Sequence, residues 1–324
     1  MLSVLDLAPI GSGGTAAAAL RQSVELARVA ERLGYVRYWF AEHHGMPGIA
    51  SSSPEILIEH IASATSTIRV GSGGIMLPNH APLRIAEVFH TLETLHPNRI
   101  DIGLGRAPGT DPVTSRAMRP FDAEQFPQQL QELIGLSAGR LPADHPFRTV
   151  RVIPAGVSLP PIWILGSSGA SARFAGSLGV GYSFARHFSP APPEPAIDAY
   201  FESFKPSDQF PKPHVILGIS VICADTQERA EYLAGSTDLV WVRYQRGEFG
   251  LLPSPEEAAA YDWSAHERAL ARAGRARHFI GTPAAVREEI DSVVKSTGAA
   301  EAIVTTMIHD PDERRRSYEL LAAS

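Results

Sequence analysis

The sequence predicts an α/β protein, a single (β/α)8 (TIM) barrel with insertions. Three observations favour this fold. Strand-like and helix-like segments alternate along the chain, polar residues follow several of the strands, and 324 residues suit a barrel of about 250 residues with added segments. We therefore expect residues 1–324 to form one domain.

Short apolar or alternating runs predict the eight strands. In chain order they lie at residues 3–8, 36–41, 68–74, 99–104, 162–165, 181–185, 215–224 and 302–307. A further short strand is possible at residues 149–153. Because each main strand is followed by a helical pattern, a closed parallel sheet is favoured over an open one.

The helices are predicted from apolar residues spaced three and four apart and from their starting residues. Ser53 and Pro54 begin one helix, with serine as the cap and proline in the first turn. Pro82 opens the next helix, and Asp310 caps the last one. Thr226 starts a long helix.

Three segments fit the repeating pattern less well. Residues 106–120 are expected to be irregular and to cover the mouth of the barrel, and a helix is expected at 121–136. Residues 241–279 are longer than a minimal connection, so we expect an insertion or extra helices there.

Composition excludes several classes of protein. The net charge is −6, and Lys and Arg are scattered, so no nucleic-acid surface is expected. Cys223 is the single cysteine, which leaves no internal disulfide. No apolar run approaches the roughly 18 residues of a membrane span, and the first residues lack the features of a signal peptide. We expect a soluble cytoplasmic protein that does not bind membranes.

Glu42, His43 and His44 follow the second strand, where barrel enzymes place their chemistry. Alternation directs one histidine toward the barrel axis and its neighbour away. We interpret both as candidate catalytic residues, and the alternative is a pair of polar residues satisfied at a strand end. No metal is expected, because the first strand has no histidine and the remaining candidates, His60, His90 and His96, fall in or at the end of helices.

The third predicted strand contains three glycines, Gly71, Gly73 and Gly74. Glycine in a strand marks a bulge or a close backbone approach. A wide flat ring could lie against such a surface, and close packing at a corner of the barrel is an equally good explanation.

A phosphate site is predicted from two neighbouring strand ends. Residues 103–109 do not form a dinucleotide fingerprint, because Pro108 occupies the position of the third glycine. Arg106 is better interpreted as a phosphate ligand, with a surface salt bridge as the alternative. The turn of Gly166, Ser167, Ser168, Gly169, Ala170 and Ser171 offers backbone N–H groups and hydroxyls at a helix start. Serine is also a common helix cap, so this turn alone does not decide the matter.

Together these motifs resemble those of the bacterial luciferase-like flavin monooxygenases. The likeness runs through Leu5–Ile10, Glu42–His44, Gly71–His80, Arg99–Gly109 and Leu165–Ser168, and it is weaker from Trp241 to His278. It is greatest for a bacterial subgroup that has Leu-Asp-Leu-Ala-Pro-Ile near the start.

The resemblance implies a barrel that binds reduced FMN, usually as a homodimer, and oxidises a small organic substrate with O2. Arg106, Ser168, Gly169 and Ser171 match phosphate-binding positions, and the Gly73–Gly74 peptide matches a bulge beneath the flavin that is often cis. His43 matches the histidine that the family needs for the reaction of reduced flavin with oxygen. We place the dimer contact on the helices at Ser53 and Pro82, with Ile56 and Phe89.

One departure limits the resemblance. Luciferases carry a reactive cysteine where this chain has Gly105, so light emission is not implied. The chain shows no convincing nicotinamide-binding motif, which favours a separate flavin reductase as the source of reduced FMN. His187 and residues 106–120 are expected to shape the substrate pocket. The alternatives are a deazaflavin-dependent reductase or dehydrogenase, a flavin-binding protein without catalysis and, least favoured, a metal-dependent hydrolase.

Overall fold

The computed structural model describes residues 1–118 and 122–324. Its parallel strands close into a (β/α)8 TIM barrel, because β10 pairs with both β1 and β8. The barrel strands are β1 (Leu2–Asp6), β2 (Arg37–Phe40), β3 (Arg69–Ser72), β4 (Ile75–Met76), β5 (Ile100–Gly105), β6 (Ile162–Gly166), β7 (Gly181–Ala185), β8 (Val215–Cys223) and β10 (Glu301–Thr305). Each of the eight predicted main strands is present.

The third barrel position is one strand broken in two. Both β3 and β4 pair with β5, and the Gly73–Gly74 peptide between them is cis, as the resemblance implied. The strand that we considered at 149–153 is absent, because that segment has no hydrogen-bonded partner strand although Val152 is buried. An unexpected strand, β9 (His278–Gly281), pairs with the end of β8 that projects beyond the barrel.

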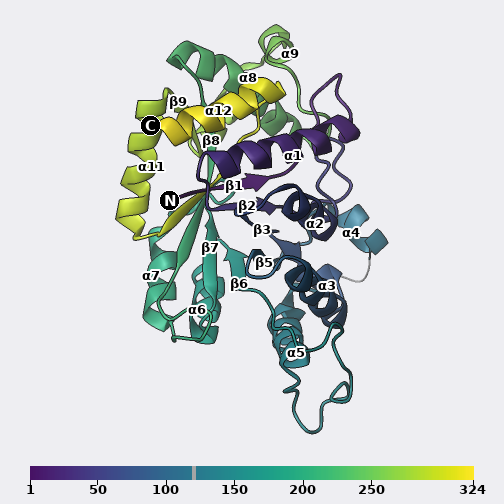
Figure 1. Cartoon of the computed structure of the whole chain (residues 1–324). Helices are drawn as coiled ribbons and strands as arrows, with labels where there is room; N and C mark the ends of the chain where they lie inside the picture. Colours follow the sequence, from purple (N-terminus) through teal and green to yellow (C-terminus); the bar gives the residue numbers. More distant parts are fainter. Residues whose placement is uncertain (119–121) are drawn as a thin grey trace.

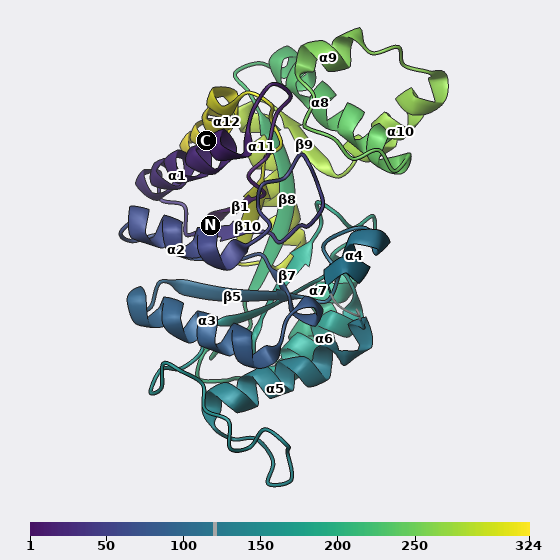
Figure 2. The same ribbon diagram turned by 90° about the vertical axis from the view of Figure 1, so that its right-hand side faces the viewer.

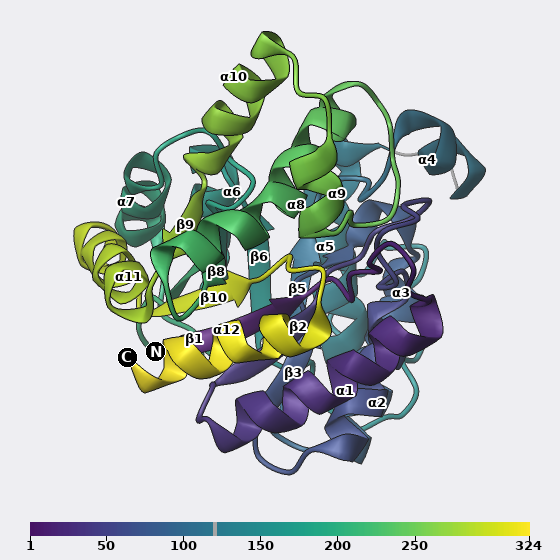
Figure 3. The same cartoon turned by 90° about the horizontal axis from the view of Figure 1, so that it is seen from above.

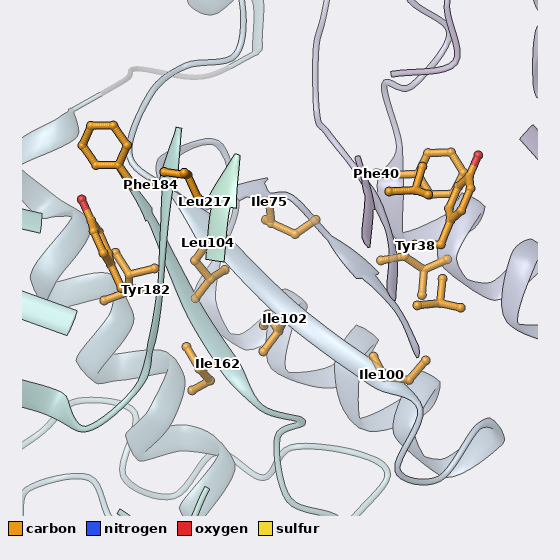
Figure 4. Packing of buried hydrophobic residues seen from close by; sticks show 14 of the residues in the cluster. Tyr38, Phe40, Ile75, Ile100, Ile102, Leu104, Ile162, Tyr182, Phe184 and Leu217 are labelled. Carbon is orange, nitrogen blue, oxygen red and sulfur yellow. The ribbon is translucent and has the colours of Figure 1, made fainter. Parts of the chain in front are cut away.

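Alternation along each strand divides the core into two parts. Figure 4 shows Ile100, Ile102 and Leu104 along β5, where they belong to the cluster packed between strands and helices. A second cluster fills the barrel itself and comprises Leu5, Trp39, Ala41, Trp163, Phe210, Ile216 and Ile303. Residues two apart on a strand therefore point to the same face. This rule identifies which residues at each strand end point into the barrel and which point outward.

The N-terminal end of the barrel is closed by buried charges. Arg37 bonds to Glu301 at 2.8 Å and to Asp101 at 2.8 Å, and Arg69 also bonds to Asp101. Burial raises the pKa of Asp101, but Arg37 and Arg69 lower it further, so the carboxylate stays ionised. The network satisfies every charge that it buries, and we interpret it as structural.

The helices surround the barrel (Figures 1 and 3). They are α1 (Ala16–Arg32), α2 (Pro54–Ala64), α3 (Pro82–Leu95), α5 (Phe126–Ala138), α6 (Gly169–Leu178), α7 (Glu194–Ser203), α11 (Pro283–Thr297) and α12 (Pro311–Ala323). Asp310 caps α12 as expected, since its side chain accepts from the N–H groups of Asp312 and Glu313. Ser53 precedes α2 but makes no side-chain cap bond, so only the proline signal was correct there.

The irregular segments contain more helix than expected. Residues 106–120 include α4 (Pro112–Met118), because the Asp111 side chain accepts from the N–H groups of Val113 and Thr114. Residues 119–121, and thus the predicted helix start at 121, lie outside the described residues. A 3-10 turn at Ala123–Gln125 then leads into α5.

The insertion near the C-terminal half forms extra helices, as predicted. It contains the end of α8 (Gln227–Gln245), α9 (Pro255–Ala260) and α10 (Ala265–Arg275). Figure 2 shows these three helices together at one side of the barrel. Among the described residues, no helix is both long enough and apolar enough to cross a membrane.

Candidate active site

The C-terminal end of the barrel interior is lined with small residues. They continue the inward-facing positions of the strands above the Trp39–Trp163 layer and are Ala41, Gly73, Gly105, Ala185, Ser220 and Thr305. Larger side chains enter from the loops that follow the strands. This is the end at which barrel enzymes bind their substrates.

His43 lies on the inner side, because it shares a face with Trp39 and Ala41. Its backbone N–H donates to the carbonyl of Ser51 at 3.0 Å. Its buried Nδ1 has no hydrogen-bond partner in the described chain. Burial lowers the pKa of His43 to about 4, Glu42 opposes the change, and His187 and His44 add to it. A neutral imidazole therefore stands at the mouth, with one nitrogen to donate and one to accept.

His44 does not join His43. Its Nε2 donates to Glu42 at 2.8 Å, on the opposite side of the strand end. The structure thus separates the two predicted catalytic histidines, with His43 on the inner face of the strand end and His44 in a polar cluster on the other.

Glu42 is the centre of that cluster and is only 1% exposed. Its carboxylate accepts from the backbone N–H of Met76 at 2.9 Å, from His80 at 3.0 Å and from Asn79 at 3.3 Å, as well as from His44. Burial raises the pKa of Glu42, but the bonds from His44, His80 and Met76 lower it to about 2. Glu42 therefore fixes β4 to the end of β2. Sequence reasoning named this residue but gave it no role.

The Gly73–Gly74 peptide is packed tightly. A Cβ on Gly73 would lie 2.7 Å from Leu5 Cδ1, and one on Gly74 would lie 2.6 Å from the Gly103 carbonyl oxygen. Close packing in the barrel thus requires both glycines, which supports the alternative that the sequence left open. The flat-ring interpretation stays a prediction.

The turn that we predicted to bind phosphate follows β6. Ser168 caps α6, since its hydroxyl accepts from the Ser171 N–H at 3.4 Å, and the Ser171 hydroxyl donates to the Ser168 carbonyl at 2.9 Å. Ser167 is exposed, and Gly169 begins the helix. The hydroxyls therefore shape the turn, and the first N–H groups of α6, at Gly169 and Ala170, have no acceptor within the helix, as an anion site requires.

Arg106 follows β5, beside the same turn. The β5–β6 register pairs Leu104 with Ile164, so Arg106 follows its strand at the level of Gly166. Arg106 is exposed and has no ion pair within the described chain, which contradicts the alternative of a surface salt bridge. Sequence reasoning missed Arg173, whose guanidinium would lie 3.3 Å from a Cβ on Gly169. The sequence did contain a signal for Arg173, since it is a basic residue in the first turns of a helix that follows a serine-rich loop.

A second polar group lies across the mouth, at β7, β8, β9 and β10. His278 Nδ1 lies 2.7 Å from the Ser220 hydroxyl, and the His187 ring covers Gly218, where a Cβ would meet Nδ1 at 2.8 Å. Burial lowers the pKa of His278 to about 4, with Arg277 and His187 adding to the change, and burial also lowers the pKa of His187. His187 was expected in the substrate pocket, but His278 was not noticed. No group of three or more acidic, histidine or cysteine residues in the described ranges could hold a metal ion.

A cavity of about 520 Å³ lies at the opposite end of the barrel, near Arg69, Asn98 and Pro160. Arg69 is already paired with Asp101 there. None of its lining residues is one of the histidines at the strand ends.

Comparison with known proteins gives a consistent result. The family model described as luciferase-like monooxygenase matches residues 1–301. A luciferase-like monooxygenase of Escherichia coli (strain K12) is 43% identical over 98% of this chain and 95% of its own length. N-acetyl-S-alkylcysteine monooxygenase of Bacillus subtilis (strain 168) is 34% identical over 99% of this chain and 97% of its own. The crystal structure of apo-MsnO8 is 38% identical, with a TM-score of 0.87 over 99% of this chain and 97% of that one.

More distant structures share the fold alone. The oxygenating constituent of 3,6-diketocamphane monooxygenase from Pseudomonas putida, solved with FMN, is 18% identical with a TM-score of 0.69, over 99% of this chain and 97% of that one. An F420-dependent secondary alcohol dehydrogenase is 14% identical with a TM-score of 0.68, over 100% of this chain and 98% of that one.

Proposed function

Because the chain belongs to the luciferase-like monooxygenase family, we propose that it oxidises a small organic substrate with O2 and reduced FMN, which a separate flavin reductase supplies. The observation that carries the proposal is the pairing of an unpartnered cation, Arg106, with the start of α6 on the neighbouring strand. The inward-facing His43 supports it from the other side of the mouth.

The residues present fit the FMN phosphate. The positive end of α6 offers backbone N–H groups at Gly169 and Ala170, and Arg106 offers a planar fork of donors. Arg173 adds a second cation beside the turn. In this proposal Ser168 and Ser171 hold the turn in shape, and Arg106 and Arg173 neutralise the phosphate.

When bound, reduced FMN supplies the electrons for the reaction with oxygen. His43 is buried and neutral, so it can donate one hydrogen bond toward developing negative charge without bringing a full charge into the site. Glu42 keeps β4 and the end of β2 together, and in this proposal it thereby positions the adjacent His43.

The name of one relative indicates a substrate class to test. That relative is named for N-acetyl-S-alkylcysteine, which makes thioethers sensible first substrates for this chain.

We also propose a cytoplasmic homodimer. Ile56 on α2 is 65% exposed and Leu95 on α3 is 57% exposed, so these helices present apolar surface. Phe89, which we had placed in the contact, is fully buried in the core and was wrongly assigned to it.

The test combines FMN titration with oxygen chemistry. The protein loaded with reduced FMN is mixed with oxygen and a panel of thioethers, and consumed oxygen, oxidised product and hydrogen peroxide are measured together. We expect His43→Ala to bind FMN nearly as well as the parent but to form product roughly 10²–10³-fold more slowly, with peroxide released instead.

Two other results would favour the alternatives. If the parent oxidises no substrate but exchanges hydride with a deazaflavin, the F420-dependent activity of the same fold replaces the proposal. If FMN binds and neither reaction occurs, the chain is a flavin-binding protein without catalysis. Equal product rates for parent and His43→Ala would make His43 a structural residue.

A further inference from the structure

We propose that the side of the mouth formed by β7, β8, β9 and β10 is a subsite for a carboxylate group of the organic substrate, held by His187, His278, Ser220 and Thr305. This inference rests on the proposed function, because it names the substrate class of that same site. None of these residues belongs to the phosphate turn or to the Glu42 cluster.

The strand pairing brings the four residues together from distant parts of the chain. Ser220 of β8 is in register with Thr305 of β10 on one side and with His278 of β9 on the other. Ala185 of β7 is in register with Gly218, and His187 follows two residues later with its ring over that glycine. Gly218 has no side chain, which is why the imidazole can lie so close to the strand.

The subsite has hydrogen-bonding capacity that the described protein does not use. The Thr305 hydroxyl and His187 Nδ1 are both buried without a hydrogen-bond partner, and Thr305 is only 5% exposed. Unpartnered buried polar atoms are rare in folded proteins, and a ligand is one of the ordinary reasons for them.

The Ser220–His278 pair also leaves one donor free in either tautomer. If the serine hydroxyl donates to Nδ1, then the Nε2–H of His278 is available. If Nδ1–H donates to serine, then the serine hydroxyl has its own proton to donate. The pair therefore always presents a donor, and a carboxylate is a pure acceptor with about four lone-pair sites.

The surrounding charges favour an anion over a neutral acceptor. Three arginines act on His278, namely Arg277, Arg275 and Arg186. Arg275 is paired with Glu231 and Asp238, but Arg186 stacks on Phe279 at 4.4 Å and Arg277 stacks on Trp241 at 3.9 Å. Neither of these last two arginines forms a salt bridge among the described residues. Glu289 and Glu194 act on Arg186 and offset part of its charge, whereas no carboxylate acts on Arg277, which therefore supplies the positive charge beside the subsite.

The location suits a substrate that reaches toward the flavin. The phosphate turn follows β6 and Arg106 follows β5, whereas the proposed subsite is centred on β8 and β10. A carboxylate held at β8 and β10 would leave the remainder of the molecule to extend across the barrel axis toward His43. The phosphate turn would thus bind the cofactor and the carboxylate subsite would bind the substrate, at different strand ends of the same mouth.

The experiment compares straight-chain acids with their primary amides on the FMN-loaded protein. Butanoate through octanoate and the matching amides are titrated by calorimetry. We expect the best acid to bind roughly ten- to a hundredfold more tightly than its amide. Thr305→Val and His187→Gln should weaken the binding of the acid by roughly tenfold each and the binding of the amide by less, because the amide oxygen accepts the same bonds without a charge. Equal binding of acid and amide, or no binding of any acid in the millimolar range, would overturn the proposal.

The matched control is Thr306→Val. Thr306 is the next residue of the chain, is 1% exposed and lies on the outer face of the sheet, so its substitution removes the same hydroxyl away from the mouth. We expect unchanged acid affinity. If Thr306→Val weakens the acid as much as Thr305→Val, the effect comes from the barrel strand and the subsite assignment is wrong. FMN affinity and melting temperature are measured for each variant, so that loss of folding is recognised.

The design also separates the two proposals. If the protein prefers acids to amides but binds no FMN, or oxidises no substrate when it is loaded with FMN, the monooxygenase proposal fails and the carboxylate subsite stands. If thioethers are oxidised equally well as acids and as amides, the monooxygenase proposal stands and the subsite fails.

Discussion

Replacement of Glu42 by glutamine tests the cluster that joins the end of β2 to β4. The substitution keeps the shape of the side chain and removes its charge. Four donors converge on this carboxylate, from Met76, Asn79, His44 and His80. A glutamine amide offers one oxygen, and its NH2 group would face a donor. At least one buried donor would lose its acceptor, which costs about 1–3 kcal/mol.

The pKa of Glu42 gives an independent magnitude. Burial raises it, but the hydrogen bonds from the two histidines and Met76 lower it from 4.5 to about 2. At about 1.4 kcal/mol for each pKa unit, this corresponds to roughly 3 kcal/mol of folding free energy. We therefore expect Glu42→Gln to lower the free energy of unfolding by about 3 kcal/mol at neutral pH.

The sign of the pH dependence follows from the lowered pKa. The contribution of Glu42 is fully present above the unfolded value of 4.5, and it is lost as the pH falls toward the folded value of about 2. The difference between parent and variant should thus be constant from neutral pH down to about 5 and should shrink below about 4.5.

The free energy of unfolding of the parent and of Glu42→Gln is measured by urea unfolding across this pH range. The control is Glu202→Gln, because Glu202 is exposed on α7 and its substitution should change stability by less than about 0.5 kcal/mol. A difference below about 1 kcal/mol at neutral pH, or one that does not change with acidification, would refute the reasoning from the four hydrogen bonds.

Three further predictions concern anchoring, stability and association. Arg106→Ala should weaken FMN binding by roughly ten- to a hundredfold in a fluorescence titration, and unchanged affinity would remove Arg106 from the phosphate site. Arg314→Ala should lower the free energy of unfolding by about 3–5 kcal/mol, because it leaves the fully buried Asp6 without its partner at 2.7 Å; the adjacent Arg315→Ala, at a half-exposed position, should have little effect. Ile56→Glu should dissociate the proposed homodimer in sedimentation velocity, and a parent that is already monomeric at micromolar concentration contradicts the dimer.

Much of the fold could be predicted because its signals are local. Each strand is a short apolar or alternating run, and each helix repeats its apolar residues at three and four, so the eight main strands were found from the sequence. The same alternation limited the axis-facing residue to one of the two adjacent histidines. Glycine and serine at Gly166–Ser171 likewise indicated a capped helix start. The failures at 149–153 and at β9 have one cause, since a strand also needs a partner that a local pattern does not reveal.

The sequence by itself determined the barrel, the strand ends that carry polar residues, and the serine-capped turn before α6. Only the tertiary structure decided which of these residues meet. It joined Glu42 to His80, buried Phe89 in the core, and brought His187, His278 and Thr305 around Ser220. The physical reason is closure of the sheet, because pairing β10 with both β1 and β8 sets which residues stand opposite one another, and that register depends on the whole chain at once.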